Sequence, residues 1–426
     1  MRYHFDSAYE GENKDGSASY PFSSLSSLMK ISLKPGDEIL LKRNSVFTDS
    51  FIHIRGLDDV KISAYGEGEL PLVDANGSGV WYQDYGVPLD NIYHKYKGEV
   101  SSAVLIEDSS NIRIESIHVR NSGNVDEKEY NSSLRMCRTG IAFVAKNRGT
   151  IKNSVIKNVV VSSVRGNIYD KHMNNGGIYF SCLKPDDEEK TGIPRFDGVS
   201  ISDSLIHDVS RWGLAVAYTY NHDKFATQKL EQKTFEKYGN LNVEIHDVFV
   251  SSAGGDGITV MYCLSPVVEH CQCESAAHEM NRSIYNQSVL FKGRVAAAIW
   301  PWKCLGAVFS RNLAIDTKLN QDGQAWDADS GDGTVYDSNF SWSNEGGAVM
   351  FCLSESVNNV FKNNISYDDL VSSITPAGNP DALLTDNVFY KRKNIPFQRI
   401  GSDGNYEEKG DRIVNIEIGD VPQFLT

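Results

Sequence analysis

The stretch Val335-Tyr336-Asp337-Ser338-Asn339-Phe340-Ser341-Trp342, followed by Gly347-Ala348-Val349-Met350-Phe351, contains the unit from which the chain is built. Two short apolar segments flank a polar turn, and a third apolar segment begins after a glycine. Three short strands per unit, repeated at roughly 20 to 45 residues, predict an all-β fold, a single-stranded right-handed parallel β-helix with lateral loops. Similar units begin at Asn111, Ile151, Val199, Val243, Val308 and Val360.

Two other architectures fit the pattern less well. A β-propeller needs four strands per blade and more even spacing, and a doubly wound α/β fold needs helices that the pattern lacks. We expect a single domain over residues 1–426, with an N-terminal cap region at 1–50, coils at 51–395 and a C-terminal tail or cap at 396–426. Departures from the repeat are expected at 24–34 (a short helix), 76–100 (a loop over one face), 185–194 and 224–238 (lateral excursions).

Charge and hydropathy restrict the partners of the protein. The 426 residues carry a formal net charge of −14, which argues against nucleic acid, because nucleic acid requires a basic surface. The same charge disfavours polyanionic substrates such as pectate or alginate, so a neutral oligosaccharide is expected. No apolar run is long enough to form a membrane-spanning helix. The oligomeric state is left open.

The first residues and the cysteines say little about location. Residues 1–22 contain no apolar segment of the kind found in a secretory signal. The protein is expected in the cytoplasm if Met1 is its natural first residue, and outside the cell or at its surface if the natural chain begins earlier. The seven cysteines cannot all pair within the chain. Four of them are expected to form a column of small buried side chains, namely Cys182, Cys263, Cys304 and Cys352.

The stretch Asp322-Gly323-Gln324-Ala325-Trp326-Asp327-Ala328-Asp329 has the frame of the third strand, but acids replace apolar side chains. Because side chains alternate across a strand, Trp326 is expected to face the core, with Asp327 and Asp329 facing outwards together. Ionised carboxylates are costly to crowd together, so a strand of this composition points to function. We interpret it as the candidate active site.

The unit before the acidic stretch carries aromatic side chains at the same outward positions. Neighbouring strands of a parallel sheet lie about 4.8 Å apart, so Trp300 is expected beside Asp327 and Trp302 beside Asp329. Aromatic rings present broad apolar faces, and the two tryptophans are candidate platforms for a sugar ring. Burial of both rings under a loop is the alternative.

Five further residues near this face are candidates for substrate binding, although each also has a structural interpretation as a turn or packing residue. They are Gln324, Arg294, Glu345, Asp256 and Tyr262. No cofactor is expected. An EF-hand is excluded because Gly331 and Ser338 occupy two of its ligand positions, whereas a structural calcium site of another kind is left open.

The acidic stretch, Trp300-Pro301-Trp302 and Asn344-Glu345-Gly346-Gly347 together resemble bacterial β-helix glycosidases, in particular glycoside hydrolase family 136, the lacto-N-biosidases. The opening Lys34-Pro35-Gly36-Asp37 is also similar, so the resemblance covers most of the chain. It implies a retaining glycosidase that releases lacto-N-biose (Gal-β1,3-GlcNAc) from a neutral β-linked oligosaccharide.

The resemblance also implies roles for the aspartates. The family uses two aspartates seven positions apart, acid/base first and nucleophile second. This implies Asp322 as the acid/base and Asp329 as the nucleophile, with Asp327 as a supporting acid. Because seven extended residues span about 23 Å, the assignment requires a sharp bend near Gly323.

Two other functions stay open at this point. A polysaccharide lyase needs a basic or phenolic side chain at a uronate, usually with calcium, and the acidic composition counts against it. A non-catalytic glycan-binding module would bind sugar without turnover, and it leaves the clustered aspartates unexplained.

Overall fold

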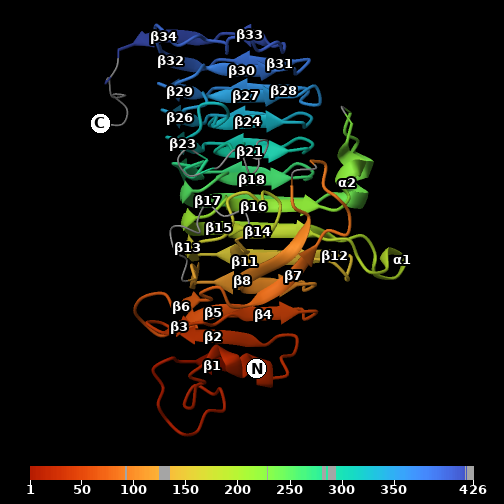
Figure 1. Ribbon diagram of the computed structural model, residues 1–426, viewed down its shortest axis with the longest axis vertical. Coiled ribbons are helices and arrows are strands. Elements are labelled where there is room, and N and C mark those ends of the chain that lie inside the picture. The colour runs from red at the N-terminus through yellow and green to blue at the C-terminus, as the bar shows by residue number, and fades with distance from the viewer. Residues whose placement is uncertain are drawn as a thin grey trace. The chain divides into compact units, whose positions relative to one another are not determined.

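The computed structural model describes residues 1–91, 94–123, 135–227, 229–280, 285, 294–417 and 419 (Figure 1). They belong to two compact units, Met1–His222 and Asp223–Thr426. Within each unit, short strands stack as successive rungs in parallel register. Crossovers between parallel strands are right-handed in nearly all proteins, and the predicted fold class, a right-handed parallel β-helix, is confirmed.

In the first unit, one wall is made of parallel strands in the order β4, β8, β11, β14 and β16. Their bounds are Ile52–Arg55, Lys97–Glu107, Cys137–Ala145, Gly176–Cys182 and Trp212–Thr219. The remaining strands except β7 belong to a second sheet: β1 (Arg2–Phe5), β2 (Glu38–Lys42), β3 (Val46–Thr48), β5 (Lys61–Tyr65), β6 (Leu72–Asp74), β9 (Ile112–Glu115), β10 (His118–Asn121), β12 (Thr150–Lys157), β13 (Val160–Val164) and β15 (Arg195–Val209).

In the second unit, the corresponding wall is β18 (Ile258–Met261), β21 (Ile299–Trp302), β24 (Trp326–Asp329), β27 (Val349–Cys352) and β30 (Ile374–Ala377). Two further series of strands complete its coils. They are β17 (Leu241–Ala253), β19 (Val267–Glu269), β22 (Val308–Ser310), β25 (Val335–Asp337), β28 (Asn359–Lys362), β31 (Ala382–Thr385) and β33 (Glu407–Lys409), and then β20 (Gln272–Glu274), β23 (Leu313–Ile315), β26 (Phe340–Trp342), β29 (Ile365–Tyr367), β32 (Val388–Arg392) and β34 (Arg412–Ile416).

The core of the second unit is a set of side-chain columns that follow this register. Ile258, Ile299, Trp326, Val349 and Ile374 lie on successive strands of the wall, directly above one another. All five side chains are fully buried, as expected for the inward positions. Burial of such a column is the main stabilising contribution, at about 25 cal/mol per Å² of apolar surface.

Buried amides connect the coils at the polar turns. The side-chain oxygen of Asn339 accepts the backbone N–H of Asn312, and Asn364 and Asn387 repeat this contact one coil further along, at 2.8–2.9 Å. Asp411 ends the series by accepting from Asn387. A buried turn has backbone groups that must be paired, which explains the Asn between the two β segments of these four coils.

Several departures from the repeat differ from the sequence expectation. The coils begin before residue 51, since β2 and β3 already pair in parallel with β5 and β6, and pairing continues past 395 in β33 and β34.

The loop expected at 76–100 contains β7 (Val80–Asp84), which pairs antiparallel with β8. The helical excursions are short: η1 (Leu25–Lys30), α1 (Glu188–Thr191), η3 (His222–Phe225) and α2 (Gln232–Tyr238).

All seven cysteines are free thiols. Cys182, Cys263 and Cys304 are buried as expected, whereas Cys352 is half-buried. In the part of the chain that the structure describes, no helix is both long and apolar enough to cross a membrane.

Shortening a core side chain should lower the stability of the coil. Ile299 is fully buried in the column described above, and Ile299→Ala is expected to lower the free energy of unfolding by about 2–5 kcal/mol. Ile413→Ala is the matched control, because Ile413 is 49% exposed and surface changes usually stay within about 0.5 kcal/mol. Urea unfolding measures both, and equal losses would contradict the inward assignment of Ile299.

Candidate active site

The outward positions of the second unit's wall bring the predicted residues together. Trp302 pairs with Asp329, as predicted from the sequence, and Asp329 pairs in turn with Cys352 on the next strand. Asp327 pairs with Met350. Three neighbouring strands, β21, β24 and β27, therefore display a polar and aromatic surface on the side opposite the apolar columns.

Asp327 and Asp329 form a compact acid cluster with Cys352. One carboxylate oxygen of each aspartate and the thiol sulfur all lie within 4.8 Å of one another. Asp327 is 5% exposed and Asp329 is half-buried. The hydroxyl of Ser330 donates to Asp329 Oδ1 at 2.6 Å. Coulomb repulsion between two carboxylates at this distance favours a proton on one of them.

The strand under this cluster is held from the inside. Tyr336 is fully buried on β25, and its hydroxyl donates to the backbone carbonyl of Asp327 at 3.1 Å. Burial raises the pKa of Tyr336 well above its ordinary value, so the phenol keeps its proton and remains a donor. The backbone beneath the acid cluster is thereby fixed by the core.

The donor set of the acid cluster is a poor match for calcium. Calcium prefers six to eight oxygen ligands, whereas the described residues offer two carboxylates and one sulfur here. The expectation that the protein uses no cofactor stays a prediction, and a structural calcium elsewhere stays open.

Asp322 occupies the turn before β24, not the strand. Its Oδ2 accepts the backbone N–H of Ala296 at 2.8 Å. Gly323 has a φ of 80°, and a side chain there would collide with the carbonyl of Leu319. The approach of Asp322 to Asp329 stays a prediction. Gly346 of the next coil packs equally closely against the carbonyl of Asp322. The turn that carries Asp322 is thus fixed by neighbouring backbone.

Trp300 is not the exposed platform that the sequence suggested. It is 3% exposed, and its indole Nε1 donates to Asp256 Oδ1 at 3.1 Å. The same oxygen accepts the backbone N–H of Ala297 at 3.3 Å. Asp256 is itself fully buried, so it acts as an anchor for Trp300 and not as an exposed ligand for substrate.

Trp302 is half-buried and packs against a second aromatic layer. Its ring lies 5.8 Å from that of Tyr262, which is fully buried and lies 5.0 Å from Phe225. Tyr262 therefore supports Trp302 from below. Of the two predicted platforms, only Trp302 has an accessible surface.

The other three candidates are engaged in the framework. Arg294, 7% exposed, donates through Nε to the carbonyl of Met280. Gln324 is fully buried and donates to the carbonyl of Gly346 at 3.3 Å. The half-buried Glu345 accepts the N–H of Leu319 at 2.9 Å.

Sequence reasoning missed two neighbours of the aspartates, and it placed Glu279 near this face without predicting its burial. Met350 and Cys352 were missed because the strand was aligned on Gly347, while the structure sets Met350, not Phe351, beside Asp327. Glu279 precedes the Trp300 strand, and its burial raises its pKa to about 8. No local pattern marks Glu279, since its environment is created by distant turns.

The fold and this cluster together define a parallel β-helix whose outer wall carries paired carboxylates beside an aromatic ring, an arrangement suited to carbohydrate. No family model matches the sequence. A lacto-N-biosidase of Bifidobacterium longum subsp. longum is 36% identical over 434 residues, which cover 91% of this chain and 27% of that protein. This chain thus spans about a quarter of the bifidobacterial protein.

Two crystal structures of GH136 lacto-N-biosidase from Eubacterium ramulus are similar throughout the chain. Both are 46% identical, with TM-scores of 0.95 and 0.94, and the matches cover 98% and 97% of this chain and 68% of theirs. The chain belongs to glycoside hydrolase family 136.

The anchor of Trp300 can be tested by substitution. Asp256→Ala leaves the buried N–H donors of Trp300 and Ala297 without this acceptor. Each donor that loses its acceptor is expected to lower the free energy of unfolding by about 1–3 kcal/mol. Asp256→Asn retains an oxygen acceptor and should lose much less. Urea unfolding, followed by tryptophan fluorescence, distinguishes the variants, and equal losses would refute the anchoring role.

Glu279 should make the stability depend on pH. The pKa of Glu279 is about 8 in the folded protein against an ordinary value of 4.5, so the folded state retains a proton that the unfolded chain releases earlier. The free energy of unfolding should therefore decrease as pH rises from about 4.5 to about 8. In Glu279→Gln this pH-dependent decrease should vanish. The free energy of unfolding of the variant, compared with that of the unchanged protein, should therefore be more favourable at pH 8 than at pH 4. An unchanged pH profile would contradict it.

Proposed function

We propose that this chain is a retaining glycoside hydrolase that releases lacto-N-biose from a neutral β-linked oligosaccharide. The observation that carries the proposal is the acid cluster of Asp327 and Asp329 beside Trp302, in a chain of glycoside hydrolase family 136. The net charge of −14 supports a neutral substrate.

In the proposed reaction, Asp329 attacks the anomeric carbon and forms an ester with the sugar. The bond to the leaving oxygen breaks, and the acid/base transfers its proton to that oxygen. Water then attacks the same anomeric carbon and gives a proton to the acid/base, while the bond from that carbon to Asp329 breaks. The sugar leaves with its original configuration. Two inversions at one carbon amount to retention.

We assign the acid/base to Asp322 and a supporting role to Asp327. A retaining pair flanks the bond with its carboxyls about 5–5.5 Å apart. The atoms of Asp327 and Asp329 lie within 4.8 Å of each other, which is close enough for one acid to tune the other but tight for a bond held between them. The two aspartates that the family uses lie seven positions apart in the sequence, and Asp322 lies seven positions before Asp329. We therefore place Asp322 on the opposite side of the scissile bond from Asp329.

The accessible ring of Trp302 is the proposed sugar platform. It neighbours Asp329 in the register and is held by Tyr262. A sugar stacked on this ring would have its anomeric carbon near Asp329.

A polysaccharide lyase remains the second candidate function, but the outward positions of β21, β24 and β27 favour hydrolysis. They carry carboxylates, indoles, a thioether and a thiol. A lyase needs a base at a uronate carbon, and two carboxylates would repel the uronate itself.

Kinetics on two leaving groups tests the roles. Asp329→Asn should reduce turnover of both a neutral tetrasaccharide that ends in lacto-N-biose and an activated aryl lacto-N-bioside by at least about 10⁴-fold, because the nucleophile is lost. Asp322→Asn should lose turnover of the tetrasaccharide but recover on the aryl substrate, whose leaving group needs no proton. Asp327→Asn should mainly shift the pH profile. Proton NMR of the first product should show the β anomer.

Asp337→Asn is the control, since Asp337 is an acid of the second sheet that contacts Lys362 and Asn363. If turnover of the aryl substrate recovers in Asp327→Asn but not in Asp322→Asn, Asp327 is the acid/base and Asp322 has the supporting role. An α-anomeric first product would overturn retention, and a rise in absorbance at 235 nm on polyuronate would favour the lyase.

A further inference from the structure

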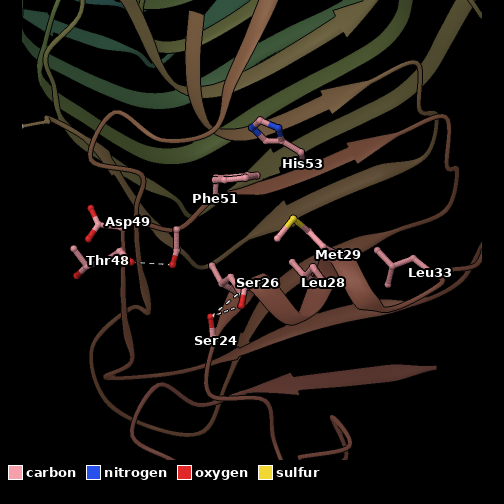
Figure 2. A pocket seen from close by; sticks show the side chains of 11 residues that line it. Ser24, Ser26, Leu28, Met29, Leu33, Thr48, Asp49, Phe51 and His53 are labelled. Atoms are coloured by element: carbon pink, nitrogen blue, oxygen red, sulfur yellow. Dashed lines mark hydrogen bonds between the residues drawn. The ribbon is translucent and has the colours of Figure 1, made fainter.

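The first unit contains a concave site that the proposed reaction does not use. A cavity of about 400 Å³ lies between η1, the loop at Thr48–Ser50 and the start of β4 (Figure 2). We refer to it as the cap pocket. Its volume is within the range of about 300–1,000 Å³ that small-molecule sites occupy.

One side of the cap pocket is apolar. Phe51 stands between His53 and η1 in Figure 2, and Leu28 and Met29 of η1 lie opposite. The Phe51 ring packs against His53 at 4.5 Å with a tilt of 48°. Met29 is 76% exposed at the entrance, an unusual position for a large apolar side chain.

The other side of the pocket is lined with hydroxyls. The Oγ atoms of Ser24 and Ser26, at the start of η1, lie 2.9 Å apart. Ser50 Oγ donates to the carbonyl of Thr48 at 2.9 Å. Asp49 Oδ1 accepts from Asn76 at 2.8 Å. These hydroxyl oxygens retain lone pairs for further hydrogen bonds.

His53 adds a neutral acceptor. Burial lowers the pKa of His53 to about 4, so the ring is uncharged near neutral pH. Its Nε2 lies 3.0 Å from the carbonyl of Ser102, which assigns the proton to Nε2. The lone pair then resides on Nδ1.

The charge of the lining restricts the ligand. The eleven lining residues include Asp49 as their one carboxylate, and none is Lys or Arg. An anionic ligand would find no cation to pair with and would be repelled by Asp49. A ligand that suits both sides must offer an apolar face to Phe51 and Met29, and hydroxyl or amide groups to the serines.

We infer that the cap pocket is a secondary binding site for a neutral sugar, of the size of one or two pyranose rings. A pyranose has an apolar C–H face and a rim of hydroxyls, which match the two sides of the pocket. The inference does not rest on the proposed reaction, because it uses only residues of the first unit.

Methionine methyl NMR can test this site and the acid cluster separately. Met29 lines the cap pocket, and Met350 is the register partner of Asp327. Galactose and N-acetylglucosamine, titrated into the full chain labelled at its methionine methyls, should shift the Met29 signal in a saturable manner. Glucuronate, the anionic analogue, should not. Met350 reports independently on the acid cluster.

Two variants complete the test. Phe51→Ala should remove the Met29 shift and leave any Met350 shift unchanged. In Ser26→Trp, the larger side chain at this exposed position fills the pocket. This variant should also remove the Met29 shift, and it keeps the packed Phe51 ring. No Met29 shift with either neutral sugar would overturn the inference, as would a shift that persists in both variants or one that glucuronate reproduces. A Met350 signal that never moves would count against the proposed reaction alone.

Discussion

The parallel hydrogen-bond register of β21, β24 and β27 is the constraint on which the rest of the second unit depends. It places Ile299, Trp326 and Val349 above one another inside the coil. By alternation, the same register places Trp302, Asp329 and Cys352 in a row outside. Since a slip of one residue would exchange the two faces, the apolar column that stabilises the fold also positions the acids.

The interior supports the outer surface in a second way. Tyr336 holds the carbonyl of Asp327 from the core, and Asp256 holds the indole of Trp300. The repulsion between crowded carboxylates is therefore opposed by packing and hydrogen bonds below them. Such crowding lowers the stability of the fold. A site with a reactive carboxylate requires this arrangement in spite of the loss of stability.

The sequence predicted the coil well because its repeat shows both the period and the inward face. It also predicted that Trp302 lies beside Asp329. It misjudged Trp300, because burial of an outward side chain depends on Asp256 from another coil. It aligned the next strand on Gly347, and two adjacent glycines gave no local signal to choose between them. The raised pKa of Glu279 could not be predicted from the sequence, since it arises only from burial in the folded chain.

We propose that this register presents Asp329 as the nucleophile. The most direct measurement is mass spectrometry of peptides after turnover of an activated aryl lacto-N-bioside is stopped rapidly with acid. We expect a glycosyl ester on the peptide containing β24, with the added mass at Asp329. A label on a different residue, or efficient turnover without any covalent intermediate, would contradict it.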